Sequence, residues 1–258
     1  MFRLVYERAG GRQSHRGRLR ASCVAILFGI LSSLMAAETA STPTEGSGVV
    51  VAVDHIVYGT PDLDAGIRKI EDMLGVRVTP GGQHPGRGTH NALVGLGPGR
   101  YLEIIGPDPD QPKPAAPRTF GIDDLKEPRL VAWAARSPDV DRQASEAARQ
   151  GIALGETAAG SRRRPDGLLL TWRFTPPQAA MAIAGGVVPF FIDWGKTPHP
   201  SESAAGGVNL VSLRAEHPEP ERVRGILEKL GIALSVSRGP KPALFATVDC
   251  PRGRIEIR

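Results

Sequence analysis

The 258-residue chain is long enough for one large domain or two small ones, and its hydrophobic fraction of 41% is ordinary for a protein that buries a core. The formal net charge is +5, but residues 1–37 contain six arginines and one glutamate, which account for the whole excess. The remainder carries 26 basic and 26 acidic residues with no long run of like charge, which indicates no nucleic-acid partner.

The first 37 residues have the order of a secretory signal peptide, with an arginine-rich start, an apolar run and small residues at the end. The apolar run of roughly 15 residues is shorter than the ~20 that span a bilayer core. The sequence therefore predicts export after cleavage near Ala36 and Ala37, with no stable membrane span; an uncleaved N-terminal anchor is the alternative.

Residues 38–49 are predicted to be a flexible tether. After cleavage Cys250 is the only cysteine, so no internal disulfide or thiolate cluster is expected.

One pattern of elements recurs about every 78 residues along the rest of the chain. Its three copies open with extended runs over 51–58, 130–136 and 208–214. A helical segment follows each run, and a glycine ends each helical segment. The recurrence predicts three strand-helix units.

The ends of these helices carry recognisable signals. In the first two copies Thr60 and Ser137 are predicted to be N-caps, each followed by proline at the first helical position. Gly75, Gly151 and Gly231 are predicted to end the three helices in the left-handed conformation.

Short extended runs separated by glycine and proline follow each helix. Each copy therefore reads as a β-α-β-β-β module, whose open sheet edge and apolar face must be buried against another copy. The predicted domain over 50–195 contains two modules, at about 50–128 and 129–195. A third module of the same kind is predicted over 207–258.

Four segments of this pattern resemble the vicinal oxygen chelate superfamily, and more narrowly its glyoxalase-like domain proteins. The residues that carry the likeness are Asp54-His55-Ile56-Val57, the segment 86–93, the segment 101–107 and the segment 189–194. The resemblance covers about residues 51–195 well and the remainder more loosely. It implies an α+β fold in which paired βαβββ modules form an open, U-shaped mixed β-sheet around a small-molecule cavity.

Metal-dependent members of that superfamily take ligands from the first and last strands of each module, which implies His55 and Glu103 as metal ligands here. Both residues lie on otherwise apolar strands, where an ionisable side chain is expensive to bury unless it is paired or bound to a cation. A histidine nitrogen and a carboxylate oxygen suit Zn, Fe, Mn, Co or Ni. The alternative is a core histidine bonded to Asp54 or to the backbone, with Glu103 paired to Arg100 or Arg118.

The second module offers no matching ligand pair. Its first strand has only alanine and tryptophan at the equivalent position. In its last strand Ile192 aligns with Glu103, and Asp193 is one residue out of phase and faces the other way unless a bulge intervenes. Asp193, His84 or His199 could complete a ligand set, but no spacing demands it.

Six residues are predicted to contact the small-molecule ligand: His84, Thr89, Asn91, Tyr101, Trp172 and Asp193. The glycine-rich segment 81–91 is interpreted as a flexible loop and strand edge at the cavity mouth, with a plain turn as the alternative. Tryptophans at strand positions are otherwise expected in the core.

The signal peptide and the resemblance together imply an exported enzyme that binds a divalent ion through His55 and Glu103 and uses it as a Lewis acid on a small oxygenated substrate. Glu103 or a neighbouring carboxylate would move the proton. The activity expected from the resemblance is of the lyase, isomerase or dioxygenase type. The alternative is a metal-free protein that binds or sequesters a small molecule in the same cavity. The third module could close the cavity or pair with a partner chain in a homodimer.

Overall fold

The computed structural model describes residues 52–258, so the predicted signal peptide and tether lie outside the described residues, and export stays a prediction. The elements of the first module are β1 (Val53–Gly59), α2 (Leu63–Leu74), β2 (Thr79–His84), β3 (Thr89–Gly95) and β4 (Tyr101–Pro107). A 3-10 helix, η1 (Thr119–Asp124), leads to the second module. The elements of the second module are β5 (Arg129–Arg136), α3 (Val140–Arg149), β6 (Ala158–Arg163), β7 (Leu169–Phe174), α4 (Pro177–Ala184) and β8 (Phe190–Asp193).

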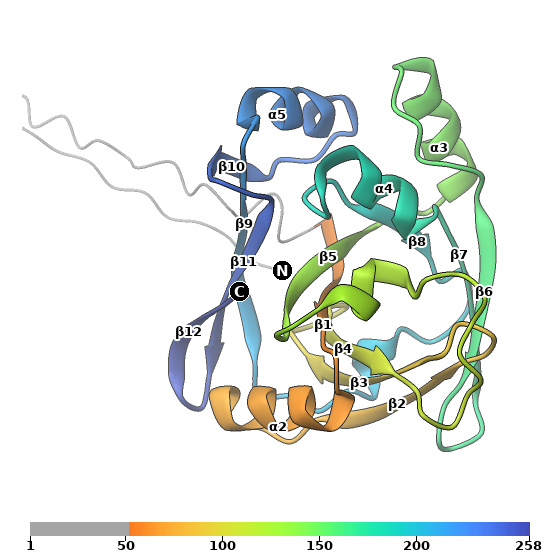
Figure 1. The fold of residues 1–258 in the computed structure, drawn as a ribbon, viewed down its shortest axis with the longest axis vertical. Coiled ribbons are helices and arrows are strands. Elements are labelled where there is room, and N and C mark those ends of the chain that lie inside the picture. Colours follow the sequence, from red (N-terminus) through yellow and green to blue (C-terminus); the bar gives the residue numbers. More distant parts are fainter. Residues whose placement is uncertain (1–51) are drawn as a thin grey trace, which may run out of the picture. The chain divides into compact units, whose positions relative to one another are not determined.

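The first two modules join in one eight-stranded sheet with the order β2-β3-β4-β1-β5-β8-β7-β6. Within each module the first strand pairs in parallel with the last, β1 with β4 and β5 with β8. The modules meet where β1 and β5 pair antiparallel at the centre of the sheet. The predicted α+β fold with paired βαβββ modules is therefore confirmed (Figure 1).

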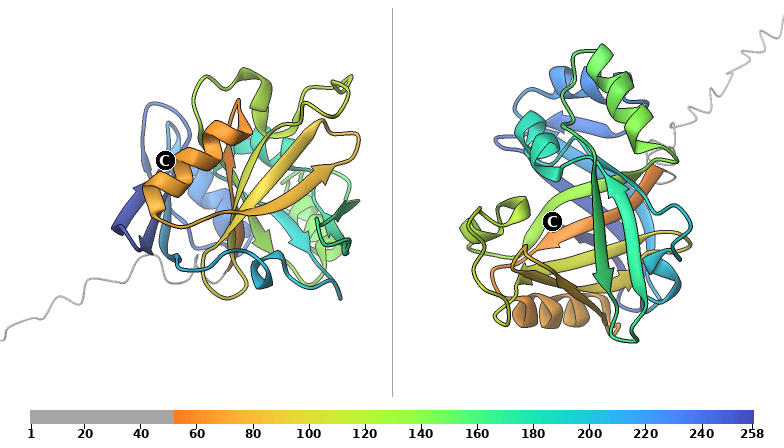
Figure 2. Two further views of the ribbon diagram at one scale, coloured as in Figure 1. Left: turned by 90° about the horizontal axis from the view of Figure 1, so that it is seen from below. Right: turned by 90° about the vertical axis from the view of Figure 1, so that its right-hand side faces the viewer.

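The eight-stranded sheet curls until its outer strands, β2 and β6, approach each other (Figures 1 and 2). A buried arginine of β6, Arg162, donates a hydrogen bond to the carbonyl of Gly81 in β2 at this seam. Gly82 has a φ of 140°, and a Cβ there would lie 2.6 Å from the carbonyl oxygen of Arg163. Glycine is needed at Gly82 because the backbones come too close for any side chain.

The third module has the predicted order of elements but a different pairing of strands. A short 3-10 helix, η2 (Pro200–Glu202), precedes it, and its elements are β9 (Asn209–His217), α5 (Pro220–Lys229), β10 (Ser235–Arg238), β11 (Ala243–Cys250) and β12 (Gly253–Ile257). Its sheet has the order β10-β9-β11-β12, so the last strand lies at an edge and does not pair with the first. This difference arises because β10 and β11 occupy the two sides of β9.

The four-stranded sheet packs on the outside of the larger one (Figure 1). One apolar cluster joins residues of β1 and α2, such as Ile56 and Ile70, to residues of the third module, such as Leu213 and Leu227. A second cluster lies inside the curled sheet and includes Val57. The protein therefore has two cores, and the cavity described below is lined by part of the inner one.

The helix N-termini differ in detail from the prediction. The N-caps are Asp62 and Asp139, whose side chains accept hydrogen bonds from the backbone of the third residue that follows. Thr60 and Ser137 lie two residues earlier and bond to the backbone of the capping residues instead. Aspartate is among the strongest N-caps, and each helix begins only after the Pro-Asp pair. The left-handed glycines after the three helices are confirmed, with φ between 71° and 78°.

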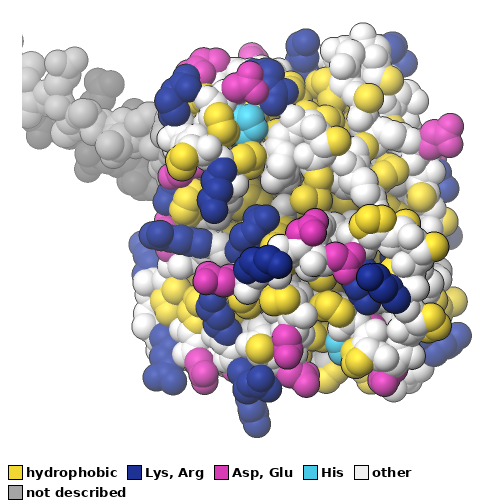
Figure 3. Space-filling view, in the orientation of Figure 1, with side chains coloured by type: hydrophobic (Ala, Val, Ile, Leu, Met, Phe, Trp, Pro, Cys, Tyr) yellow, Lys and Arg dark blue, Asp and Glu magenta, His cyan; other side chains and the backbone are white. Residues whose placement is uncertain are grey.

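Among residues 52–258, none of the helices has the length and apolar content needed to cross a bilayer. On the face shown in Figure 3, basic and acidic side chains are interspersed with each other and with apolar ones.

Candidate functional site

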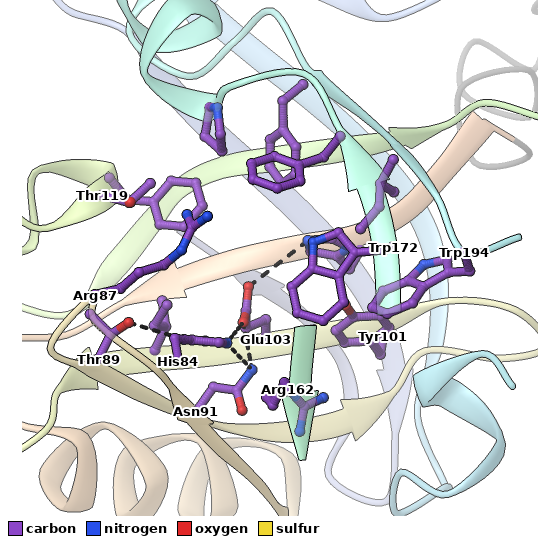
Figure 4. A pocket seen from close by; sticks show the side chains of 17 residues that line it. His84, Arg87, Thr89, Asn91, Tyr101, Glu103, Thr119, Arg162, Trp172 and Trp194 are labelled. Atoms are coloured by element: carbon purple, nitrogen blue, oxygen red, sulfur yellow. Dashed lines mark hydrogen bonds and ion pairs between the residues drawn. The ribbon is translucent and has the colours of Figure 1, made fainter. Parts of the chain in front are cut away.

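A cavity of about 80 Å³ lies inside the curled sheet, and its wall contains seven of the eight predicted site residues. This volume exceeds the ~10–15 Å³ that one water molecule needs and suits a small organic molecule. The predicted residues in the wall, most of which Figure 4 labels, are His55, His84, Thr89, Asn91, Tyr101, Glu103 and Trp172. The fold thus brings these residues together, while their roles remain predictions.

Asp193 lies apart from this group. It lines a separate depression with Arg173 and Lys196, and its neighbour Ile192 lines the cavity instead. The β7–β8 ladder pairs Arg173 with Asp193 without a register shift, so the side chains of β8 alternate strictly. The out-of-phase position therefore directs Asp193 away from the predicted ligand.

A β-bulge in β1 shapes the centre of the site. The pairing of β1 with β5 shifts register between Val53 and His55. Val53 belongs to the outer core, whereas His55 and Val57 face inward. A bulge lets two successive side chains, Asp54 and His55, lie close together, which regular alternation would prevent.

Asp54 is fully buried and accepts hydrogen bonds from three side chains. Its Oδ1 lies 2.8 Å from His55 Nδ1 and accepts from Trp194 Nε1 at 3.1 Å. Its Oδ2 lies 3.1 Å from His199 Nε2 and 3.6 Å from Arg136 Nε. Burial raises the pKa of Asp54, but the hydrogen bonds and charges of His199 and His55 outweigh it and hold the pKa well below its usual range.

The hydrogen bonds of Asp54 fix the tautomers of both histidines. An ionised carboxylate only accepts, so Nδ1 of His55 carries a proton, and in the neutral ring the Nε2 lone pair is free. His199 Nδ1 accepts from the backbone N–H of Ser201 at 3.2 Å, so its proton lies on Nε2 and points to Asp54. His55 Nε2 has no hydrogen bond within residues 52–258, and it faces Glu103 Oε2 at 3.9 Å.

Glu103 is held by an amide on the neighbouring strand. Asn91 Nδ2 donates to Glu103 Oε1 at 2.6 Å and lies 3.4 Å from His84 Nε2 (Figure 4). His84 Nε2 therefore accepts, and His84 Nδ1 donates to Thr89 Oγ1 at 3.0 Å. Glu103 thus presents Oε2 to His55 while Oε1 is held by hydrogen bonding.

Burial keeps His84 neutral near neutral pH. Desolvation lowers its pKa to about 4, an effect opposed by Glu103 and reinforced by the charges of Arg162 and Arg87. In the unfolded chain a histidine has its ordinary pKa of about 6.5. Between pH 6.5 and 4 the unfolded chain therefore binds a proton at this position that the folded protein does not bind.

This difference predicts a pH-dependent loss of stability. As the pH falls from about 6.5 to about 4, the free energy of unfolding should drop by up to about 3 kcal/mol through His84 alone. Urea unfolding of the wild type and of His84→Gln at several pH values measures it. The difference between their unfolding free energies should change across this window, and a pH-independent difference would contradict the buried neutral imidazole.

Aromatic side chains form much of the remaining wall. The His55 ring stacks on Tyr101 with centroids 4.7 Å apart and meets Phe190 edge-on at 5.4 Å. Trp172 and Trp194 contact each other at 5.2 Å. Burial raises the pKa of Tyr101 well above 10, so it stays a neutral hydroxyl. These contacts hold the imidazole plane in place and make the cavity wall largely apolar.

Two cationic residues that sequence reasoning missed also line the cavity, Arg87 and Arg162. Arg87 comes from the turn between β2 and β3, and Arg162 from the seam strand β6. His199 and Trp194 were missed as partners of Asp54. None of these contacts has a local signal, because each depends on the closure of the sheet or on the segment that follows β8.

The side chains present do not supply a complete metal-binding set. His55 and Glu103, the two predicted ligands, face each other at 3.9 Å, and His84 Nε2 lies 3.8 Å from the other carboxylate oxygen. Nowhere in the described part of the chain do three His, Cys, Asp or Glu side chains group closely enough to hold one ion. Catalytic zinc sites use three protein ligands, and the positions facing His55 from the second module are apolar.

Solved structures of similar fold come from several organisms. A hypothetical protein from Staphylococcus aureus is 13% identical with a TM-score of 0.52, and the match covers 79% of this chain and 83% of that chain. Methylmalonyl-CoA epimerase from Mycobacterium tuberculosis is 20% identical with a TM-score of 0.39, over 58% of this chain and 91% of that one. The Streptomyces coelicolor epimerase in complex with 2-nitronate-propionyl-CoA is 19% identical with a TM-score of 0.41, over 58% and 99%. The first likeness shows the fold alone, and the two epimerases support no conclusion about this chain.

No curated protein matches the sequence. The family model described as "Glyoxalase-like domain" matches residues 53–231, from β1 through the glycine that ends α5. The match thus spans both modules of the eight-stranded sheet and the first strand and helix of the third. The chain belongs to the glyoxalase-like domain family, within the vicinal oxygen chelate superfamily.

Proposed function

We propose that this protein is an exported enzyme that transfers a proton on a small oxygenated molecule, with His55 Nε2 as the general base. One observation carries the proposal: the Asp54 carboxylate binds Nδ1 at 2.8 Å, so that the neutral imidazole has its basic nitrogen, Nε2, at the cavity wall. A histidine base oriented by a carboxylate on its other nitrogen is the arrangement by which catalytic triads hold their general base.

The step is a proton abstraction next to a carbonyl group. The C–H bond of the substrate breaks, its proton bonds to His55 Nε2, and the electron pair moves onto the carbonyl oxygen as an enolate. Asp54 stabilises the imidazolium that forms at Nδ1, and Glu103 Oε2 faces the newly protonated Nε2. The positive charge of Arg162 lies within range of Glu103 and Tyr101 and stabilises the negative charge that develops in the cavity.

The fate of the enolate decides the reaction class. Return of the proton to the same carbon gives epimerisation, return to a neighbouring atom gives isomerisation, and departure of a group β to the carbonyl gives elimination. No divalent ion enters this sequence because the side chains at the site do not form its ligand set. The reactive machinery in this proposal consists of His55, Asp54 and Glu103.

Hydrogen–deuterium exchange tests the proposal most simply. The purified protein is incubated in D₂O with hydroxyacetone, pyruvate or 2-oxobutanoate, and the loss of the C–H signals next to the carbonyl is followed by proton NMR. We expect exchange above the protein-free rate for at least one probe, at the same rate after dialysis against a chelator. Exchange that disappears with the chelator and returns with a metal ion would contradict the metal-free step.

A second candidate function is binding without chemistry. It is favoured by the apolar wall that the second module contributes, which includes Phe174, Phe190 and Ile192. Trp172 and Trp194 line the same cavity, so ligand binding should change the tryptophan fluorescence. Fluorescence changes with no exchange of any bound probe would favour the sequestering protein over the enzyme.

A further inference from the structure

We propose that the substrate is a small organic monoanion, and that Arg87 binds its carboxylate group at the cavity wall. This inference deepens the proposed function by naming a substrate class for the same site, and it rests on that function only for the reaction. The charge preference of the cavity is a separate property, which binding alone can test.

Arg87 is a guanidinium without an anionic partner at the wall of a cavity. It lies in the turn between β2 and β3, and its Cζ lies 5.2 Å from the centroid of the Phe174 ring. Within residues 52–258 its side chain forms no hydrogen bond and no ion pair, and only its backbone N–H donates, to the carbonyl of His84. Partial burial lowers the pKa of Arg87, and the charge of Glu103 opposes this shift without forming an ion pair. The guanidinium has therefore lost part of its hydration without binding a carboxylate directly.

The arginines elsewhere in the protein behave differently. Most of those on the outer surface pair with a carboxylate of the chain, as in Arg118 with Asp123 and Arg254 with Asp249. Arg87 and Arg162, which line the cavity, have no such pair within the described residues. Arg162 is only 3% exposed, and the one hydrogen bond of its side chain within those residues is to the Gly81 carbonyl, where β2 and β6 meet. Both arginines of this cavity are therefore among those that do not pair with a carboxylate.

The charges of the cavity favour one negative charge on the ligand. Two guanidinium groups and one carboxylate, Glu103, line the wall, while the neutral His84 adds nothing near neutral pH. Asp54 lies behind the wall and is already satisfied by its hydrogen bonds and by Arg136. A monoanion balances this site, whereas a dianionic phosphate would exceed it and a cation would be repelled.

The wall also sets where the anion lies relative to the base. Figure 4 shows Arg87 and Thr119 on one side of the cavity and Trp172 and Trp194 on the opposite side. A carboxylate bound at Arg87 would leave the carbon skeleton against the aromatic residues and within the small volume next to His55. The arrangement fits a short oxo-carboxylate, whose planar carboxylate matches the planar fork of arginine.

The test compares an acid with its uncharged ester. Binding of 2-oxobutanoate and methyl 2-oxobutanoate to the full-length protein is measured by tryptophan fluorescence at constant ionic strength. We expect the wild type to bind the acid at least tenfold more tightly than the ester. Arg87→Gln should weaken binding of the acid by roughly 10- to 100-fold and leave the ester unchanged, because one charge-assisted bond is lost.

Arg68→Gln is the matched control, because it removes the same charge from the exposed face of α2, outside the cavity. Arg87 lies on an exposed turn, and urea unfolding of Arg87→Gln confirms that the variant folds. Equal binding of acid and ester, an Arg87→Gln variant that binds the acid like the wild type, or no binding of either probe would overturn the inference. Charge-dependent binding without deuterium exchange would instead leave it standing and refute the proposed reaction.

Discussion

Replacement of His55 by glutamine is expected to lower the deuterium-exchange rate by about 10²–10⁴-fold, the usual contribution of a general base. Glutamine keeps a polar group of similar length but has no basic nitrogen at neutral pH. The side chain lies at the cavity wall with Nε2 free and Nδ1 bound to Asp54, whereas Nε2 of His84, the other imidazole in the wall, accepts from Asn91. The rate is measured by proton NMR in D₂O with whichever probe the wild type exchanges.

His90→Gln is the control for that variant. His90 lies on β3 and lines a different depression, together with Asp62 and Asp108. We expect it to exchange the probe at the wild-type rate. A His55→Gln variant that retains the wild-type rate while folding normally would remove His55 from the reaction.

Asp54→Asn is expected to have an effect of similar size on the rate, about 10²–10⁴-fold, through the tautomer of His55. Three N–H donors, from His55, His199 and Trp194, converge on the carboxylate oxygens. An amide places its own N–H donors where one of its oxygens accepted, so at least one of these bonds is lost or reversed. The variant should also lose about 1–3 kcal/mol of stability because a buried donor is left unsatisfied.

A graded set of variants separates the two effects. His199→Ala removes one donor to Asp54 Oδ2 but leaves the 2.8 Å contact to His55 intact. It should lower stability while changing the exchange rate less than Asp54→Asn does. Equal losses of rate in both variants, in proportion to lost stability, would show that Asp54 acts only through the fold.

The sequence predicted the repeated modules because their signals are local. Glycines with positive φ after each helix and short apolar runs between turns are properties of a few neighbouring residues. The helix α4 was missed because Pro-Gln-Ala-Ala-Met-Ala-Ile-Ala is nearly apolar throughout and has no amphipathic period. The strand pairing in the third module could not be predicted from the sequence either. The same order of elements allows β9 to pair with β10 and β11.

Some residues of the site could likewise be predicted from the sequence, and others could not. His55 and Glu103 were predicted from the resemblance to the superfamily, and the position of each ionisable side chain on an otherwise apolar strand agreed with it. The bulge at Asp54 breaks the strand period, and nothing in the local sequence marks it. Arg162 and His199 reach the site only through the closed seam and the segment after β8, which bring residues more than 80 positions apart into contact.

The tautomer of His55 is the most direct test of the account. The ¹⁵N NMR spectrum of the six histidine rings is recorded near neutral pH, and the signals of His55 are assigned by their absence in His55→Gln. We predict a protonated Nδ1 and an unprotonated Nε2 in the wild type, and a loss of this preference in Asp54→Asn. A His55 protonated at Nε2 in the wild type would contradict the general-base mechanism, because no lone pair would then face the cavity.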